Sequence, residues 1–277
     1  MAQILDGKVV RDQIAKELES RIKNLESRPK LVIIQVGDNP ESNTYISQKI
    51  KFGEKIGALV NHQKFPADIS ESDLNSKLLT LNSDPLTHGI IVQLPIPESL
   101  NKEEIIESIN PAKDVDGLSS VNLKKLMEND QTGFVPATTK GILTLLDHYQ
   151  IKVEGKHVVV VGRSTLVGKP TALALLNLDA TVTVCHKQTG DIKPFTKTAD
   201  IIISAVGKPG LITKNHVSKD QVIIDVGTTV VDGKLKGDVD FNEVSKIVSA
   251  ISPVPGGIGP MTVASLFQNL LQAHQNS

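Results

Sequence analysis

Short apolar runs rich in β-branched residues recur along the chain and are separated by stretches with helical periodicity. Each run is apolar throughout, which is typical of strands covered on both faces of a parallel sheet. The runs are LVIIQV (31–36), GIIVQL (89–94), HVVVVG (157–162), TVTVC (181–185), DIIISAV (200–206), QVIIDVG (221–227) and KIVSAIS (246–252). This alternation of strand and helix predicts a doubly wound α/β fold.

The stretches between the runs carry apolar residues at three- and four-residue spacing, as expected of helices with one buried face. The clearest stripes are Ile14, Leu18, Ile22 and Leu25, and then Ile142, Leu145, Leu146 and Tyr149. Residues 42–56 and 262–274 also have a helical pattern. Asp232-Gly233, inside 230–239, predicts a surface hairpin.

A chain of 277 residues is long enough for two domains. From residue 156 onward, the order strand, glycine turn, helix, strand is that of a dinucleotide-binding domain. We expect a first domain of residues 1–140 plus 262–277 and a Rossmann-like domain, with a doubly wound parallel sheet, of residues 141–261. The predicted helix at 262–274 would return to the first domain, so that two connecting helices join the two lobes.

Composition excludes several classes of partner. A formal net charge of −1 gives no field for nucleic acid or an anionic membrane. No apolar run approaches the roughly 20 residues that span a bilayer. The single cysteine, Cys185, and a start that lacks the apolar stretch of a secretory signal favour the cytoplasm.

No Cys/His cluster has metal-ligand spacing and Gly-x-Ser-x-Gly is absent, so no metal site and no covalent hydrolysis are expected.

A glycine-containing turn, Gly162-Arg163-Ser164-Thr165-Leu166-Val167-Gly168, follows the predicted strand at 157–161 and opens a helix. Glycines let the backbone approach a phosphate, and the helix N-terminus supplies free N–H donors. Gly162 and Gly168 are one residue further apart than G-x-G-x-x-G allows, and such a turn alone is plain structure roughly half the time.

The next predicted strand ends in Cys185-His186-Lys187 without the carboxylate that NAD enzymes usually place there. Arg163 and Lys187 could flank the 2′-phosphate of NADP, or they could be two solvated surface cations. We favour NADP. Two further loops, 205–209 and 225–228, have a glycine directly after an apolar strand, where ligands of open α/β sheets bind.

Candidate substrate residues lie in the first half of the chain. Tyr45 and Lys49 are one helical turn apart, so both project from one face of the predicted helix. A ring there can stack on a planar heterocycle and an amine can exchange protons, although such a pair is more often plain surface. Gln93 ends a predicted strand before two prolines. Asp114 and Asp116 lie in a loop, where Asp-Gly is equally explained by turn chemistry.

Five segments together indicate a resemblance to a known enzyme family. They are SNTYISQKIK (42–51), GIIVQLP (89–95), KDVDG (113–117), GRSTLVGKP (162–170) and PVPGGIGPMT (253–262). In this order they closely resemble the bifunctional methylenetetrahydrofolate dehydrogenase/methenyltetrahydrofolate cyclohydrolase family, from about Gly7 to the last predicted helix. The last two segments are highly specific to that family.

The resemblance implies a two-lobed homodimer that binds a folate between its lobes. Such an enzyme oxidises 5,10-methylene-tetrahydrofolate to 5,10-methenyl-tetrahydrofolate with NADP and hydrolyses the product to 10-formyl-tetrahydrofolate. By the same likeness, Lys49 is the principal catalytic residue, Gln93 orients it, Tyr45 stacks on the folate, and Asp116 accepts hydrogen bonds from the pterin. The other implied contacts are Pro255, Gly256 and Gly257 for the substrate, and Gly162, Arg163, Ser164, Lys187 and Thr228 for NADP.

Three segments depart from the family pattern. The usual Pro-Cys-Thr-Pro is Pro136-Ala137-Thr138-Thr139 here, Lys187 replaces a common serine, and Thr228-Thr229 replaces Ile-Asn. Two alternatives remain open on sequence alone: an enzyme with only the dehydrogenase step, using NAD or NADP, or a catalytically silent module that senses NADP. A sensor has no need for the reactive lysine, which argues against the second alternative.

Overall fold

A computed structural model describes residues 2–277, which divide into two compact units. The three-stranded unit contains residues 12–125, 130–137 and 263–277. The six-stranded unit contains residues up to 11, then 126–129 and 138–262. Each unit is named here for its main sheet.

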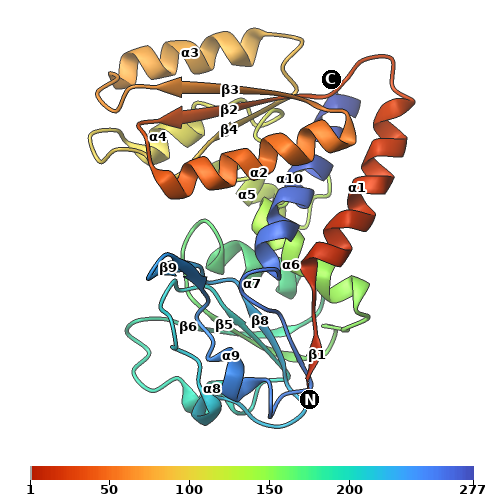
Figure 1. The fold of residues 1–277 in the computed structure, drawn as a ribbon, viewed down its shortest axis with the longest axis vertical. Coiled ribbons are helices and arrows are strands. Elements are labelled where there is room, and N and C mark those ends of the chain that lie inside the picture. The colour runs from red at the N-terminus through yellow and green to blue at the C-terminus, as the bar shows by residue number, and fades with distance from the viewer. Residues whose placement is uncertain (1) are drawn as a thin grey trace. The chain divides into compact units, whose positions relative to one another are not determined.

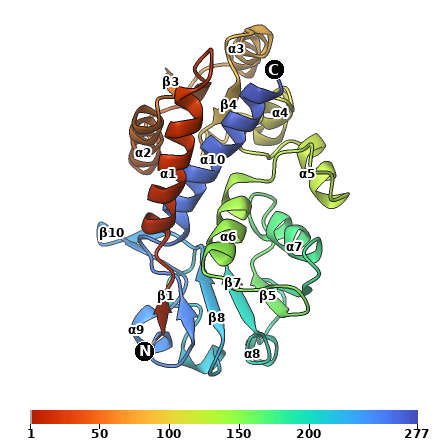
Figure 2. The same ribbon diagram turned by 90° about the vertical axis from the view of Figure 1, so that its right-hand side faces the viewer.

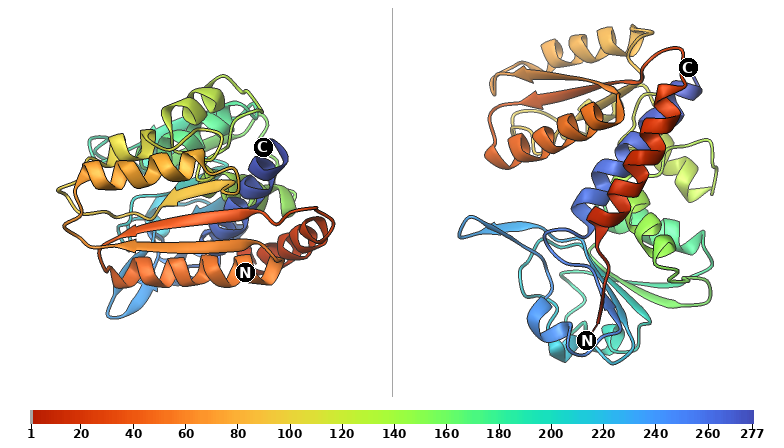
Figure 3. Two further views of the ribbon diagram at one scale, coloured as in Figure 1. Left: turned by 90° about the horizontal axis from the view of Figure 1, so that it is seen from above. Right: turned by 45° about the vertical axis from the view of Figure 1, so that its right-hand side comes forward.

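The sheet of the three-stranded unit has the order β3-β2-β4 and is parallel throughout. Its strands are β2 (Lys30–Val36), β3 (Leu59–Phe65) and β4 (Gly89–Val92). Helix α2 (Pro40–Ile56) covers one face of this sheet and α3 (Glu71–Ser83) the other (Figures 1 and 3). Val32 and Ile34 of β2 pack with Leu74 and Leu78 of α3 in one buried cluster.

Four more helices contribute to this unit: α1 (Gly7–Lys23), α4 (Lys102–Glu107), α5 (Ser120–Met127) and α10 (Ile258–Gln275). The rings of Phe52 in α2 and Phe267 in α10 lie 5.3 Å apart. Gly53 allows this packing, since a Cβ there would overlap Val60 of β3. Helix α2, which carries Tyr45 and Lys49, is therefore held on two sides.

The six-stranded sheet is also parallel and has the order β1-β11-β8-β7-β5-β6. Figure 2 shows β8, β7 and β5 side by side. The strands are β1 (Gln3–Ile4), β5 (His157–Val161), β6 (Thr181–Cys185), β7 (Ile201–Ser204), β8 (Val222–Asp225) and β11 (Ala250–Ile251). Because β6 and β7 flank β5 on opposite sides, the winding reverses between β5 and β7. The carboxyl ends of these two strands are the switch point at which open α/β sheets bind ligands.

Both faces of this sheet are covered, as the apolar runs predict. Val159 and Val161 of β5 belong to a cluster with Ile192 and Val244, while Val158, on the opposite face, is equally buried. The helices of the unit are α6 (Ala137–His148), α7 (Gly168–Leu176), α8 (Lys193–Thr196), α9 (Phe241–Val244) and a short 3-10 helix, η1 (Lys214–His216). The predicted hairpin is confirmed: β9 (Thr229–Val231) and β10 (Lys234–Lys236) pair antiparallel around Asp232-Gly233. The doubly wound α/β prediction is confirmed.

The structure differs from the sequence predictions in three places. Strand β3 was not predicted, because it is an edge strand with mostly exposed side chains. The run at 246–252 forms only the short β11. The first eleven residues were expected in the first domain, but β1 pairs with β11, so they belong to the six-stranded unit.

Candidate active site

Lys49 lies on α2 with its side chain partly buried, and Tyr45 lies one turn earlier on the same helix. The start of α2 is well defined, because the side chain of Asn39 accepts hydrogen bonds from the Glu41 and Ser42 N–H groups and Pro40 occupies the first turn. Lys49 Nζ donates a 2.9 Å hydrogen bond to Gln93 Oε1. The helix and the end of β4 thus bring these two side chains together.

Gln93 follows the last residue of β4, and its own N–H still bonds to Ile34 O of β2 at 2.8 Å. Its side-chain Nε2 donates to Leu94 O at 2.8 Å. With the amide nitrogen engaged in this way, the oxygen Oε1 faces Lys49. The strand terminus therefore fixes both the position and the orientation of this amide.

Asp116 lies close enough to Lys49 for the two charges to interact. Burial lowers the pKa of Lys49, and the Asp116 carboxylate opposes this shift. Burial likewise raises the pKa of Asp116, and the charge of Lys49 opposes it. In both groups desolvation is the larger effect, so the surroundings favour the neutral amine more than water does.

The turn that carries Asp116 is shaped by the buried carboxylate of Asp114. Its Oδ1 accepts a hydrogen bond from Gly117 N–H at 3.0 Å, and its Oδ2 accepts from Ser119 N–H at 2.8 Å and from Asn122 Nδ2 at 3.0 Å. Gly117 has a φ of +72° and lies too near the backbone at Phe134 for a side chain. Asp114 is thus a structural residue that holds Asp116 in place.

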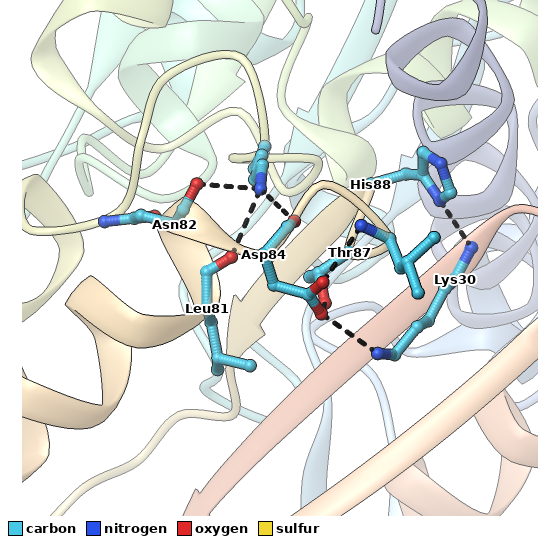
Figure 4. Close-up of polar contacts among 8 residues, drawn as sticks. Lys30, Leu81, Asn82, Asp84, Thr87 and His88 are labelled. Carbon is cyan, nitrogen blue, oxygen red and sulfur yellow. Dashed lines mark hydrogen bonds and ion pairs between the residues drawn. The ribbon is translucent and has the colours of Figure 1, made fainter.

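Lys113 anchors the same loop from its other side. Its ammonium donates to the main-chain oxygens of Leu81, Asn82 and Asp84 at 3.2, 2.8 and 2.7 Å, at the C-terminal end of α3. Figure 4 shows the side chain of Asp84 between Thr87 and Lys30, with Lys30 Nζ 3.1 Å from Asp84 Oδ2. This role could not be predicted from sequence, because main-chain acceptors have no pattern of their own.

The glycine turn lies at the switch point of the six-stranded sheet. Gly162, with φ +126°, approaches so closely that a Cβ would overlap the carbonyl oxygen of Ala205, and a Cβ on Gly168 would overlap that of Gly162. Ser164 Oγ accepts from the N–H groups of Val167 and Gly168 at 3.2 and 3.3 Å, at the start of α7. A cradle that only glycine fits, at a helix N-terminus, suits the pyrophosphate of a dinucleotide.

Arg163 is exposed, and its Nη2 donates to Gln188 Oε1 at 3.1 Å. This bond joins the glycine turn to the loop after β6, which contains the exposed Lys187. Residues 186–190 contain no carboxylate. Two cations thus lie where a 2′-phosphate would need them, so the donors fit NADP better than NAD.

The loops after β7 and β8 are joined to each other. Thr229 Oγ1 donates to Gly207 O at 2.9 Å. Thr228 is exposed at this edge, and so is Val206, with 46% of its surface accessible. These residues therefore stand at the carboxyl ends of strands next to the switch point.

Pro255, Gly256 and Gly257 precede α10 and belong to the six-stranded unit. Gly256 has a φ of +116°, its carbonyl oxygen accepts from Gly7 N–H at 2.9 Å, and Gly257 N–H donates to Pro253 O at 2.8 Å. A side chain on Gly7 would overlap Gly257 O. This segment is consequently packed against the start of α1.

The unusual Ala137-Thr138-Thr139 is well accommodated. Ala137 is 1% exposed, and its N–H donates to Asp116 O at 3.1 Å. Thr139 Oγ1 lies 3.0 Å from Thr171 Oγ1 of α7, in a fully buried contact. The threonine that replaces the family proline therefore ties α6 to α7.

Among residues 2–277, no group of three or more His, Cys, Asp or Glu side chains is arranged to hold a metal ion. Within the same residues, every helix is too short or too polar to pass through a bilayer.

A glycine cradle at the switch point of a parallel sheet is the arrangement of a dinucleotide-binding α/β protein. Two protein-family models match the chain. The model for the catalytic domain of tetrahydrofolate dehydrogenase/cyclohydrolase matches residues 5–116, and the model for the NAD(P)-binding domain of the same enzyme matches residues 136–277. The chain belongs to the tetrahydrofolate dehydrogenase/cyclohydrolase family.

Similar proteins match this chain over nearly their whole length. The bifunctional protein FolD of Lactobacillus gasseri is 46% identical over 97% of this chain and 96% of its own. A FolD structure from Campylobacter jejuni has a TM-score of 0.98 and 42% identity, and covers 100% of this chain and 99% of its own. A Trypanosoma brucei FolD, solved with NADP and an inhibitor, has a TM-score of 0.95 and 36% identity, over 99% of this chain and 98% of its own.

The predicted family, activity and cofactor are confirmed by these matches. The chain is an NADP-dependent bifunctional enzyme: it oxidises 5,10-methylene-tetrahydrofolate to the 5,10-methenyl form and hydrolyses that product to 10-formyl-tetrahydrofolate. Because the proteins that are 46% and 42% identical to this chain are both named as bifunctional, the dehydrogenase-only and silent-sensor alternatives are set aside.

Proposed function

We propose that the folate binds on the three-stranded unit with its one-carbon bridge beside the amine of Lys49. Tyr45 stacks on its ring system, and Asp116 accepts hydrogen bonds from the pterin. The observation that carries this proposal is the 2.9 Å bond from Lys49 Nζ to Gln93 Oε1, at a site where burial favours the neutral amine. Substrate contacts by Pro255, Gly256 and Gly257 remain a prediction from the family resemblance.

Oxidation removes a hydride from the methylene carbon and releases no proton, so it needs alignment more than an acid or base. NADP, when bound, supplies the acceptor for that hydride. Gly162, Arg163, Ser164, Lys187 and Thr228 are proposed to hold it. For this step, Tyr45 and Asp116 fix the folate so that the methylene carbon is correctly presented.

Hydrolysis begins with the addition of water to the methenyl carbon. Lys49 takes one proton from that water, and its N–H bond to Gln93 keeps the lone pair directed. The adduct then shifts its hydroxyl proton to N5 as the bond from the carbon to N5 breaks, which leaves 10-formyl-tetrahydrofolate. One proton is released overall, and Lys49 passes it to solvent. Arginine could not do this, because it does not give up its proton in proteins.

The proposal is tested with the purified enzyme and methenyl-tetrahydrofolate, followed by absorbance without added nucleotide. Hydrolysis above the spontaneous rate is expected, because water, Lys49 and the folate suffice for that step. If hydrolysis took place only in the presence of NADP, the assignment of the base to Lys49 on α2 would be contradicted.

Replacement of Arg163 by alanine is expected to raise the KM for NADP about tenfold, since a guanidinium contact to a 2′-phosphate is lost. The KM for NAD, which lacks that phosphate, should change little. Steady-state dehydrogenase assays with each nucleotide measure both values. Lys197→Ala removes an exposed cation elsewhere on the same unit and should leave both unchanged. Equal losses with NADP and NAD would mean that Arg163 does not read the phosphate.

We further propose that the enzyme is a cytoplasmic homodimer, as the family resemblance and the single buried cysteine suggest. Light scattering on the eluting peak of a sizing column is then expected to give twice the 29.8 kDa of one chain. A mass equal to that of one chain at micromolar concentration would contradict the dimer.

A further inference from the structure

Two buried carboxylates lie at the carboxyl edge of the six-stranded sheet, and the chemistry described above uses neither. Asp225, the last residue of β8, is 3% exposed. Asp238, which follows the β9–β10 hairpin, is fully buried. Because burying a carboxylate is costly unless it is well hydrogen-bonded, the partners of these two groups indicate what they do.

Asp238 binds the end of β7 and the loop after it. Its Oδ2 accepts from Ser204 Oγ at 2.9 Å and from Val206 N–H at 2.8 Å. Its Oδ1 accepts from Lys208 N–H at 2.6 Å. Three donors within five consecutive residues therefore converge on one carboxylate, and both its oxygens are used.

Asp225 holds the backbone that carries Asp238. Its Oδ1 and Oδ2 accept from the N–H groups of Asp238 and Val239, both at 3.0 Å. Burial, assisted by the charge of the neighbouring Asp238 carboxylate, raises the pKa of Asp225 to about 7, although the N–H donors of Asp238 and Val239 oppose this rise. The side chain of Asp225, at the end of β8, thus holds the backbone of residues 238–239. The side chain of Asp238 in turn holds the loop after β7.

Two glycines leave room for these carboxylates. A Cβ on Gly227 would overlap the carboxylate of Asp238, and a Cβ on Gly237 would overlap that of Asp225. The segments Asp225-Val226-Gly227 and Gly237-Asp238 therefore fit each other as a pair. Each supplies one carboxylate and the space for the other.

We propose that Asp238 is a positioning residue for the dehydrogenase step, holding residues 205–208 in the conformation that receives the nicotinamide end of NADP. This rests on the proposed placement of NADP at the carboxyl edge of the sheet. The loop it holds leaves Val206 exposed there. Charge-assisted bonds to main-chain N–H groups are strong and directional, so a carboxylate fixes such a loop better than an apolar side chain would.

The test is Asp238→Asn, in which an amide NH₂ must face at least one N–H donor. The dissociation constant of NADP, measured by titration calorimetry, is expected to rise about tenfold. In the nucleotide-free enzyme, the amide hydrogens of Val206 and Lys208 should exchange faster. Hydrolysis of methenyl-tetrahydrofolate, which needs no nucleotide, should keep its rate, and a purely structural role would lower it as well.

Asp240→Asn is the matched control, because it removes the same charge two residues away. The side chain of Asp240 caps α9 by accepting from Glu243 N–H, and its own N–H donates to Ile212 O, so these bonds lie outside the 205–208 loop. Asparagine caps a helix equally well. It should change neither NADP affinity nor the exchange of Val206. Unchanged NADP affinity in Asp238→Asn, or an equal loss of both activities, would overturn the positioning role alone. Failure of the unsubstituted enzyme to bind NADP would overturn the cofactor placement with it.

Should Asp238→Asn not fold, Ser204→Ala removes only the hydroxyl bond to Oδ2. NADP binding is then expected to weaken about threefold, and hydrolysis should stay intact. The loss is small because only one of the three hydrogen bonds to the Asp238 carboxylate is removed, and its donor is a neutral hydroxyl. Unaltered affinity and unaltered exchange of Val206 in this variant would overturn the proposal.

Discussion

Lys49→Met is expected to lower the cyclohydrolase rate by about 10²- to 10⁴-fold, the usual contribution of a positioned general base. Methionine reaches as far as the Cε atom of lysine and fills most of the partly buried space, so α2 should remain folded. The dehydrogenase rate should fall less, since hydride transfer needs no base. Spectrophotometric assays of each step on the same preparation give the two ratios.

Lys51→Met is the matched control, because Lys51 is exposed on the same helix two residues later. Both activities should stay near those of the unsubstituted enzyme. Full hydrolysis by Lys49→Met would refute the assignment of the base.

The pH profile of hydrolysis provides a second measure of the same residue. Burial lowers the pKa of Lys49 from 10.5, so the neutral amine accumulates at lower pH than for a free lysine. The enzymatic rate should therefore rise with pH and level off above the folded-state pKa of Lys49. This limb should vanish in Lys49→Met. A midpoint at or above 10.5 would show that the site does not favour the neutral amine.

Gly162→Ala is expected to lower dehydrogenase kcat/KM by at least about 100-fold, which corresponds to about 3 kcal/mol. The new methyl group would overlap Ala205 O, at a φ of +126° that alanine rarely adopts. The turn must then move away from the switch point, and the phosphates lose their cradle. NADP titration and the NADP-dependent assay measure the loss, while hydrolysis without nucleotide should persist.

Gly155→Ala separates the effect of a positive φ from the effect of the steric overlap with Ala205 O. Gly155 also has a positive φ, +69°, but a Cβ there meets nothing within 4 Å. We expect a modest loss of stability, about 1 kcal/mol, with unchanged NADP affinity. If both variants lost NADP binding equally, strain and not the close approach to Ala205 would be the cause.

The covered strands could be predicted from sequence, whereas the uncovered ones could not. The central strands β2, β5, β7 and β8 are mostly apolar because helices or loops cover them on both faces. Strand β3 pairs with β2 over its whole length, yet Leu59 is 43% exposed and no apolar run marks it. An edge strand is held mainly by its backbone, and backbone hydrogen bonds have no side-chain signature.

The same distinction applies to the site. Lys49 and Gln93 could be singled out because their chemistry resides in the side chain, and the structure has them bonded. Lys113 and Asp238 could not, since most of their partners are main-chain groups of residues far away in the sequence. Such partners become visible only once the fold has brought the backbone to them.

The chain passes back and forth between the two units, so each unit is assembled from three separate stretches of sequence. No single cut can release either unit as one continuous fragment. An investigator who wants one activity without the other must therefore alter individual side chains, because a truncated gene would encode an incomplete core.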